Sequence, residues 1–498
     1  MKKFLFSLSA IIVFSNTMLA QNLNDVLRYS LLEVGGTARS VGVGGAIGAL
    51  GADFSVLSTN PAGAAAFRRS EFTFTPTFER ATADGLLAGD GNFLREDSKS
   101  NFNLNNIGII FSGRPLDSKW RTAVFGIGIN RMANFHQNIF YEGSTFGSIT
   151  DRWWELAGTL PEGQLDQFEA APALAAEALY DYDPQLGYLT DFLDADEQPG
   201  SFLVDKSQRI ERKGSINELA FTYAGNYDEK LMIGATLGVP ILKYEETKTY
   251  IETDESDRVP FFESLEFKES LKTTGGGINL KLGMIYRLSQ MVRFGLAIHT
   301  PTSFGLEDNF STSTKYEFDL GQGGETREGN SPESNFEYRI RTPWRLIGSG
   351  GVIINKKGFL SAEFEFVDYT SSRFNFNSTD NQGDLDYEQE LNDQIANELG
   401  STVNMRLGGE YALDQFRLRA GFTLTPSPYE TGGDTNTTFS VGAGYRGQEF
   451  FIDLAYKRLS NQSNYKPYLL STGLQNLEQS VSIDEQRDRF MVTLGFKL

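Results

Sequence analysis

The sequence of 498 residues contains no cysteine and only two histidines, His136 and His299. Without cysteine the chain forms no disulfide, presents no thiolate and carries no lipid-anchoring cysteine, and two histidines argue against a histidine-rich metal site. After residue 20 the sequence also has no run of eighteen apolar residues, which excludes a spanning helix there but not a spanning β-barrel. We therefore expect no metal and no cofactor.

Positive charge is also scarce, because 45 Lys and Arg residues stand against 65 Asp and Glu residues. The formal net charge of −20 becomes −22 when a segment carrying Lys2 and Lys3 is removed (−20 minus 2). Binding to phosphate backbones needs a basic surface, so this balance disfavours a nucleic-acid partner. With 40% hydrophobic and 22% charged residues the chain as a whole is not of the disordered class.

The N-terminal residues 1–20 have the pattern of a secretory signal peptide. Lys2 and Lys3 form the basic start, Phe4–Phe14 the apolar core, and Ala20 precedes the predicted cleavage site. Met18 is larger than the residue normally found at that position, so the cleavage site is not fixed by the sequence. An uncleaved anchor is the alternative, but the apolar run is short for a spanning helix.

Alternation of apolar and polar residues with period two dominates the sequence after residue 70, as in strands with two different faces. The last strand shows it best, with these apolar residues on one face: Phe490, Val492, Leu494, Phe496 and Leu498. The same analysis predicts fourteen strands. They span residues 71–80, 103–113, 122–138, 208–227, 231–249, 265–286, 291–315, 334–354, 359–377, 401–412, 415–427, 437–446, 449–460 and 485–498.

The lengths of the predicted links decide between a soluble sandwich and a membrane barrel. Links after even-numbered strands are short, whereas links after odd-numbered strands are longer. Strict alternation of short and long links is expected when one barrel end faces the periplasm and the other faces outward. We therefore predict an all-β fold: a transmembrane antiparallel β-barrel of about fourteen strands in the outer membrane of a Gram-negative cell.

Two long links carry helical patterns of their own. Residues 151–157 (DRWWELA) and 163–182, the latter despite Pro172, are predicted as helices, and so is Tyr387–Leu399. We place both links on the extracellular side, where long structured loops commonly serve as lids or binding surfaces. For Trp153 and Trp154, packing within the loop is favoured over contact with lipid or ligand.

The stretch Val34–Phe67 is rich in glycine and alanine and fits neither a stable helix nor a solvated linker. Its glycines allow close packing inside a lumen, and the turn at Asn60-Pro61 is favoured by both residues. In this stretch the residues Gly36-Thr37-Ala38-Arg39, Gly44-Gly45-Ala46, Asp53 and Asn60-Pro61-Ala62 resemble the N-terminal hatch of the FadL-type outer-membrane transporters.

The resemblance implies a signal peptide (1–20), an N-terminal plug in the lumen (21–70) and an outer-membrane β-barrel (71–498) with helical extracellular loops. It implies passive uptake of hydrophobic molecules such as long-chain fatty acids, by a protein we take to be monomeric and surrounded by outer-membrane lipid. In the family, release is sideways through a gap beside the third strand, and Gly126 and Gly128 are the candidate residues for that gap. The motif Asn60, Pro61 and Ala62 is the candidate plug turn. A branch of the same superfamily suggests an alternative role as a barrel component or shuttle of type IX protein secretion.

Eight charged residues of the late strands are predicted to point into the lumen: Glu363, Glu365, Arg406, Glu410, Arg417, Arg419, Asp453 and Lys457. Pairing with one another across the sheet is one interpretation. The other is that Arg406, Arg417 or Arg419 binds a ligand carboxylate, which a guanidinium does well through two parallel hydrogen bonds. His299 lies near Thr300 and Ser303 without a nucleophile motif, so it is interpreted as a polar lumen residue and the protein as not an enzyme.

Overall fold

The computed structural model describes residues 23–33, 35–116, 118–185, 187–193, 199–200, 202–321, 323–355, 357–376, 382–470 and 474–498. The signal peptide predicted for residues 1–20, with its cleavage site, lies outside the described residues.

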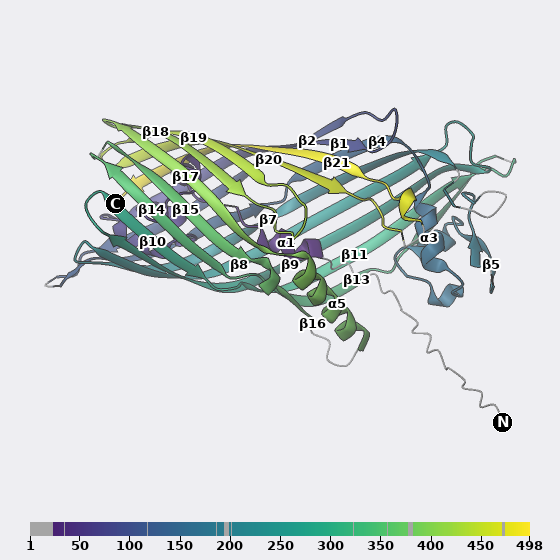
Figure 1. The fold of residues 1–498 in the computed structure, drawn as a ribbon, viewed down its shortest axis with the longest axis horizontal. Helices are drawn as coiled ribbons and strands as arrows, with labels where there is room; N and C mark the ends of the chain where they lie inside the picture. Colours follow the sequence, from purple (N-terminus) through teal and green to yellow (C-terminus); the bar gives the residue numbers. More distant parts are fainter. Residues whose placement is uncertain are drawn as a thin grey trace, which may run out of the picture.

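Fourteen antiparallel spans form a closed barrel (Figure 1). Ten are single strands: β1 (Glu71–Leu87), β2 (Arg95–Gly113), β7 (Leu203–Tyr227), β8 (Leu231–Thr253), β9 (Phe262–Arg287), β17 (Ser401–Leu413), β18 (Phe416–Thr425), β19 (Asn436–Arg446), β20 (Phe450–Tyr465) and β21 (Val481–Lys497). Four are built from two pieces each: β3 (Trp120–Asn134) with β4 (Gln137–Phe146), β10 (Val292–His299) with β11 (Ser303–Phe318), β14 (Arg345–Ile354) with β13 (Ser334–Arg341), and β15 (Gly358–Asp368) with β16 (Arg373–Phe376). Pairing of β1 with both β2 and β21 closes the wall. The predicted barrel is confirmed.

The interrupted spans are a correction to the prediction, which treated 122–138, 291–315, 334–354 and 359–377 as continuous strands. Two of the breaks contain a proline, Pro301 and Pro343, and proline has no N–H to give to a ladder. The two breaks lie beside each other, since the Thr342 N–H donates to the Thr302 carbonyl (3.0 Å). Several strands also run further outward than predicted; β1, for example, ends at Leu87 rather than at residue 80.

The links alternate as predicted, with short turns at one end of the barrel and long links at the other (Figure 1). At the turns after β7, β14 and β17, Asp228, Asn355 and Asp414 adopt positive φ, which these residue types tolerate. The long links carry further short strands: β5 (Tyr180–Asp183), β6 (Gly187–Leu189) and β12 (Glu325–Asn330).

The helices of the long links match the prediction in part. The helices α3 (Ile149–Ala157) and α5 (Gln382–Glu398) were predicted, and the Trp153 side chain is buried in the loop core as favoured. The second predicted helix is wrong over most of its length, because only α4 (Ala170–Ala175) is helical and Tyr180–Asp183 pairs as a strand instead. Short 3-10 turns complete the links: η3 (Glu162–Gln164), η4 (Tyr369–Ser371) and η5 (Gln475–Leu477). Among the described residues, no helix combines the length and the apolar character that a membrane crossing needs.

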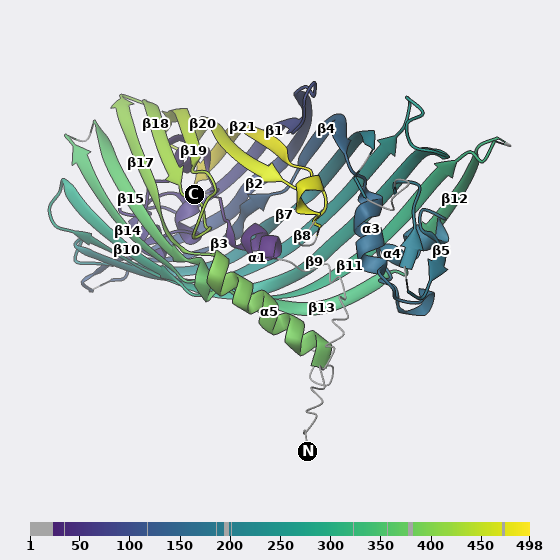
Figure 2. The same ribbon diagram turned by 45° about the vertical axis from the view of Figure 1, so that its right-hand side comes forward.

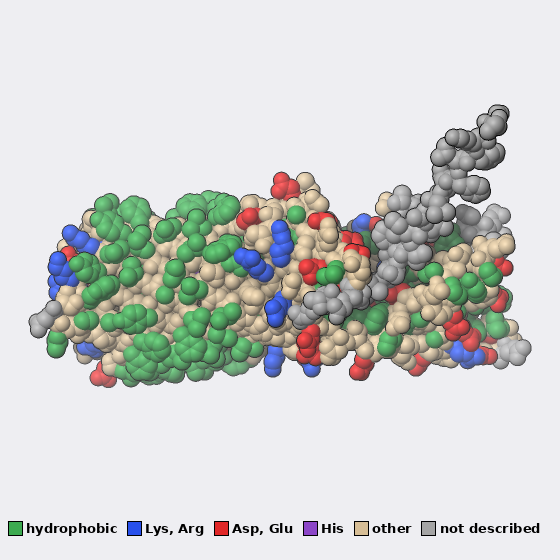
Figure 3. All heavy atoms as spheres, turned by 90° about the horizontal axis from the view of Figure 1, so that it is seen from below, with side chains coloured by type: hydrophobic (Ala, Val, Ile, Leu, Met, Phe, Trp, Pro, Cys, Tyr) green, Lys and Arg blue, Asp and Glu red, His purple; other side chains and the backbone are tan. Residues whose placement is uncertain are grey.

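Apolar side chains gather on the outer surface near the short-turn end of the barrel, while charged side chains are frequent towards the long links (Figure 3). On β8, β9 and β10 the exposed apolar residues are Ile233, Leu237, Ile241, Leu280, Leu282, Met284, Phe294, Leu296 and Ile298. Further outward on β7 the exposed residues are Arg209, Glu211 and Lys213. A spanning strand needs about 9–11 residues, whereas β9 has 26. The apolar part of the outer surface therefore lies near the short-turn end of the wall, and the wall projects well beyond it at the other end.

Candidate functional site

The N-terminal segment occupies the inside of the barrel (Figure 2). It contains α1 (Leu23–Ser30), α2 (Ala38–Gly42), η1 (Phe54–Leu57) and η2 (Pro61–Ala66). The helix α2 contacts strands β18 to β21, whereas η2 contacts β3, β7, β8 and β9 on another part of the wall. The segment therefore bridges the lumen, and we call residues 23–67 the plug.

Close approach between plug and wall explains several of the glycines. Gly44 adopts positive φ, and a Cβ on Gly421 of β18 would overlap its backbone. A Cβ on Gly283 of β9 would overlap the Asn60 side chain. Gly421 admits no side chain because two backbones meet there, and Gly283 admits none because Asn60 packs directly against it.

The predicted plug turn Asn60-Pro61-Ala62 lies at the start of η2. Asn60 Oδ1 accepts a hydrogen bond from the Ala62 N–H (3.2 Å), which caps the turn, and Pro61 occupies the first helical position. Asn60 Nδ2 donates to the carbonyls of Gly48 (2.7 Å) and Met284 (3.3 Å). One side chain thus connects the turn, another loop of the plug and strand β9.

A second fastening holds the plug at α2. Thr37 Oγ1 donates to the Asp53 carboxylate (2.8 Å), and the Ala38 N–H donates to Thr493 Oγ1 of β21 (2.7 Å). Ser55 Oγ also donates to Asp53 (2.6 Å). All five residues are buried, so these bonds lie inside the barrel, where they are stronger than in water.

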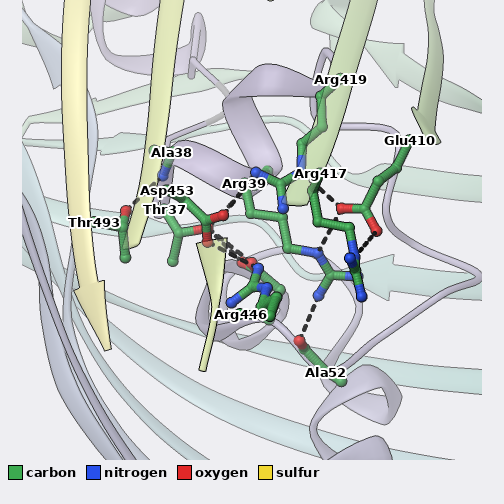
Figure 4. A network of polar contacts seen from close by, with 12 residues as sticks. Thr37, Ala38, Arg39, Ala52, Glu410, Arg417, Arg419, Arg446, Asp453 and Thr493 are labelled. Carbon is green, nitrogen blue, oxygen red and sulfur yellow. Dashed lines mark hydrogen bonds and ion pairs between the residues drawn. The ribbon is translucent and has the colours of Figure 1, made fainter. Parts of the chain in front are cut away.

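The arginines predicted to meet a ligand carboxylate lie in two clusters, and the first is near the short-turn end (Figure 4). Arg419 donates to Glu410 and to Asp453, at 2.7 Å each, and Arg446 donates to Asp453 at 2.8 Å. Arg417 lies 3.8 Å from Glu410 and donates to the carbonyl oxygens of its own turn. We call Arg417, Arg419, Arg446, Glu410 and Asp453 the inner-end cluster. A cavity of about 310 Å³ adjoins this cluster.

Arg406 belongs to the second cluster, further outward. It donates to Glu363 (2.7 Å) and also to Glu365, which Arg345 approaches from β14 (2.8 Å). Glu363 in turn accepts the Gly48 N–H of the plug (3.0 Å). The predicted inward orientation of these side chains is confirmed by their burial and pairing.

A polar cavity of about 120 Å³ adjoins Arg406 and is lined on one side by Leu31, Leu32 and Glu33 of the plug. Within the described part of the chain, four buried polar atoms of residues that line this cavity have no hydrogen-bond partner: Arg406 Nε, Asn404 Oδ1, Asn436 Oδ1 and Ser440 Oγ. Buried polar groups are almost always hydrogen-bonded. A small polar lumen site with unused donors and acceptors is suited to the head group of an amphipathic molecule.

The third span contains the two glycines predicted to mark a gap. Gly126 pairs with Ile110 of β2 and Thr222 of β7, and Gly128 pairs with Gly108 and Ala220. A Cβ on Gly128 would overlap the Phe54 ring of η1. At these glycines the wall is continuous and packs against the plug.

The wall is interrupted higher on the same span. The β2–β3 ladder ends at the pair Asn106–Asn130, and among the described residues Arg95–Asn105 of β2 pairs only with β1. Beyond that pair β3 continues its pairing with β7, with a register shift between Arg131 and Ala133. Asparagines cluster at the break: Asn106 donates to Asn130 (2.8 Å) and Asn101 donates to Asn134 (3.3 Å).

No protein-family model matches the chain, and no curated protein matches it. Among solved structures it is similar to a FadL homologue of Pseudomonas aeruginosa, with a TM-score of 0.54 and 13% sequence identity over 94% of this chain and 99% of that chain. The chain has the FadL-type fold. Two toluene transporters, TbuX of Ralstonia pickettii and TodX of P. putida, match at 14% and 13% identity, each with a TM-score of 0.48 over 93% of this chain and 99% of theirs.

The resemblance drawn from the plug motif is thus confirmed at the level of the FadL-type fold. Glu33, Glu79 and Arg489 are among the charged residues inside this barrel that sequence reasoning missed. The strand pattern placed no emphasis on them, although Glu79 and Arg489 lie opposite each other in the β1–β21 register. The alternating asparagines at 101, 103 and 105 were the visible signal for the polar break in the wall.

Proposed function

We propose that this FadL-type barrel mediates passive uptake of hydrophobic molecules across the outer membrane, with amphipathic carboxylates such as long-chain fatty acids as cargo. The protein acts as a monomer and performs no chemistry on its cargo. The outer leaflet resists apolar solutes, so such molecules need a protein that takes them from outside and releases them past the plug.

The observation that carries the proposal is the break between β2 and β3 beside a plugged polar interior. Backbone groups that lack a ladder partner are costly in contact with lipid, so a spanning barrel normally closes all its ladders. An interruption that is lined by asparagines and adjoins the plug supports a sideways exit. It lies above Gly126 and Gly128, and those glycines contribute by letting η1 pack against the wall below it.

The head group of the cargo is proposed to bind in the polar cavity beside Arg406. Arg406 Nε has no hydrogen-bond partner among the described residues, whereas the two terminal guanidinium nitrogens donate to Glu363 and Glu365. Arg419 pairs with Glu410 through Nε and with Asp453 through Nη1, and its Nη2 has no hydrogen-bond partner among the described residues. Arg417 has the weakest carboxylate contact of the three candidates and adjoins the cavity at the short-turn end.

The test compares a deletion strain with the same strain expressing the protein, using radiolabelled hexadecanoate at equal cell density. We expect faster uptake with the protein present and an unchanged set of secreted proteins. Unchanged uptake together with loss of secreted proteins in the deletion strain would refute the proposal in favour of a protein-secretion role.

A further inference from the structure

The plug residues that join α1 to α2 lie at the break in the wall. We call Leu31–Glu33 together with Gly35 and Gly36 the leader. The Glu33 N–H donates to the Met132 carbonyl of β3 (2.9 Å), and Asn105 Nδ2 of β2 donates to the Gly36 carbonyl (2.7 Å). These two bonds join the leader to both strands that border the break. The leader therefore supplies the contacts that the β2–β3 ladder lacks at this height.

The Glu33 side chain holds the leader from the other side. Its carboxylate lies 3.0 Å from Lys457 Nζ of β20 and 2.9 Å from Arg489 Nη2 of β21. Arg489 also pairs with Glu79 of β1 (2.5 Å). In the described part of the chain, Glu33 is the only carboxylate that pairs with Lys457. Removing Glu33 without replacement would leave a buried ammonium unpaired, which is strongly unfavourable.

The leader also divides the interior. The cavity of about 120 Å³ beside Arg406 and a second one of about 40 Å³ beside His299 share Leu32, Glu33 and Arg345 in their linings. Pockets that hold drug-sized ligands measure about 300–1,000 Å³. Neither cavity accommodates such a ligand while the leader stays in place, so binding beside Arg406 or His299 requires the leader to move.

We propose that Lys457 and Arg489 form an anion-binding pair that Glu33 occupies as an internal counter-ion until the anionic head group of a hydrophobic ligand replaces it. This inference rests on the proposed uptake function. The exchange keeps both cations paired, so it avoids the cost of an isolated buried charge. Because ligand and Glu33 compete for one site, the ligand favours the state in which the leader has left the break. An uncharged hydrophobic molecule gains no such advantage.

The test uses purified full-length protein in detergent and exploits the absence of native cysteine. Leu32→Cys reports on the leader and Val41→Cys, in α2 beside the same cavity, reports on the rest of the plug. A polar maleimide is added to each variant with and without Glu33→Gln. The matched control for the lost charge is Glu142→Gln, which removes a half-exposed carboxylate paired with Arg95.

We expect Glu33→Gln to raise the labelling rate of Leu32→Cys at least about tenfold, a factor that needs only a small change in free energy. Val41→Cys stays protected, and Glu142→Gln changes neither rate. Hexadecanoate raises labelling of Leu32→Cys in the protein with native Glu33, whereas hexadecan-1-ol does not. Glu33→Gln also binds hexadecanoate more tightly than the unsubstituted protein, and Lys457→Gln binds it more weakly, with hexadecan-1-ol binding unchanged in both.

Unchanged labelling of Leu32→Cys in Glu33→Gln would contradict the proposal that Glu33 holds the leader in place. Equal labelling of Leu32→Cys and Val41→Cys would contradict it as well, because the whole plug would then be moving. Equal effects of hexadecanoate and hexadecan-1-ol would overturn the anion site. If neither probe binds the unsubstituted protein, the proposed uptake function fails, and the anion site fails with it. The ligand-free labelling still decides whether Glu33 holds the leader.

Discussion

The barrel contains two groups of buried ion pairs that are built alike but connect different parts of the molecule. In the inner-end cluster, the shortest pairs join Arg419 to Glu410 and Asp453, which all belong to the wall, and Arg39 of the plug adds a longer contact to Glu410 (3.6 Å). Around Glu33 the pairs join the wall, through Lys457 and Arg489, to the plug. The strand-to-strand pairs of the first group can change only if the barrel deforms. The second can exchange one partner while the wall stays intact, so similar chemistry serves stability in one place and movement in the other.

The largest expected effect is a loss of folding stability when the inner-end cluster is disrupted. Asp453→Ala leaves Arg419 and Arg446 without a shared buried carboxylate, and breaking such pairs costs about 3–5 kcal/mol. We expect a clear fall in the midpoint of urea unfolding measured in lipid vesicles. Asp488→Ala removes the exposed pair with Arg458, worth about 0–1 kcal/mol, and serves as the control. Equal shifts for the two variants would contradict the structural role of the inner-end cluster.

The second prediction concerns the turn that fixes the plug. Asn60→Ala with Pro61→Gly removes the cap, the bonds to Gly48 and Met284 and the restriction of φ, but breaks no ladder of the barrel. We expect normal insertion and heat-resistant migration on gels, together with impaired hexadecanoate uptake or a leak to small solutes. A matched change on the outside, Asn330→Ala with Pro332→Gly, should alter neither. Wild-type uptake and permeability at equal protein level would mean that the turn is only a tether.

The third prediction distinguishes two of the arginines. Arg406→Gln removes the side chain whose free Nε adjoins the polar cavity, so hexadecanoate should bind more weakly and hexadecan-1-ol should bind unchanged. Arg417→Gln loses a 3.8 Å carboxylate contact and two hydrogen bonds to the carbonyl oxygens of its own turn, and it should have a smaller effect on both ligands. Isothermal titration in detergent measures the two affinities. Equal losses for the acid and the alcohol would assign Arg406 to structural pairing alone.

The smallest expected effect lies in the long loop that contains α3. Burial raises the pKa of Asp151 to about 7, with Glu252 and Glu155 adding to the shift and the Ser148 N–H and Lys206 opposing it. Burial raises the pKa of Glu169 to about 7 as well, despite Arg152. Both values exceed the unfolded value of about 4, so the folded loop binds protons more tightly and is most stable at acid pH.

Stability of this loop should therefore fall as pH rises from about 4 to about 7. Hydrogen exchange of α3, corrected for the intrinsic pH dependence, should be less protected at pH 8 than at pH 5.5. Asp151→Asn should reduce this difference, since its side chain does not titrate. A loop that gains protection at alkaline pH would contradict the assignment.

The sequence predicted the barrel because alternation and link lengths are local properties that survive in any closed antiparallel wall. It predicted the inward direction of Arg406 and Arg419 for the same reason, since successive side chains along a strand point to opposite faces of the wall. It predicted the helix α3 but not the short extent of α4, where tertiary packing pairs Tyr180–Asp183 with β6.

The partners of the charged residues could not be predicted in the same way. Glu33 meets Lys457 and Arg489 only because the plug folds back across the lumen, a contact between residues more than four hundred positions apart. The position of the break above Asn130 could not be predicted either, because the alternation of side chains along β2 and β3 does not indicate where the two strands separate. Gly126 and Gly128 looked like marks of a distortion, but their lack of a side chain is equally required by packing against Phe54 and Leu57.

The most direct test of the proposed uptake function is transfer of hydrophobic ligand by the purified protein in lipid vesicles, without the metabolism of a cell. Vesicles that contain the protein and empty vesicles receive radiolabelled hexadecanoate presented on albumin, and the initial rate of its appearance in the vesicle is measured. We expect a rate that rises with the amount of protein, is lowered by unlabelled hexadecanoate and is changed by Asn60→Ala with Pro61→Gly. A rate equal to that of empty vesicles at every protein level would contradict it.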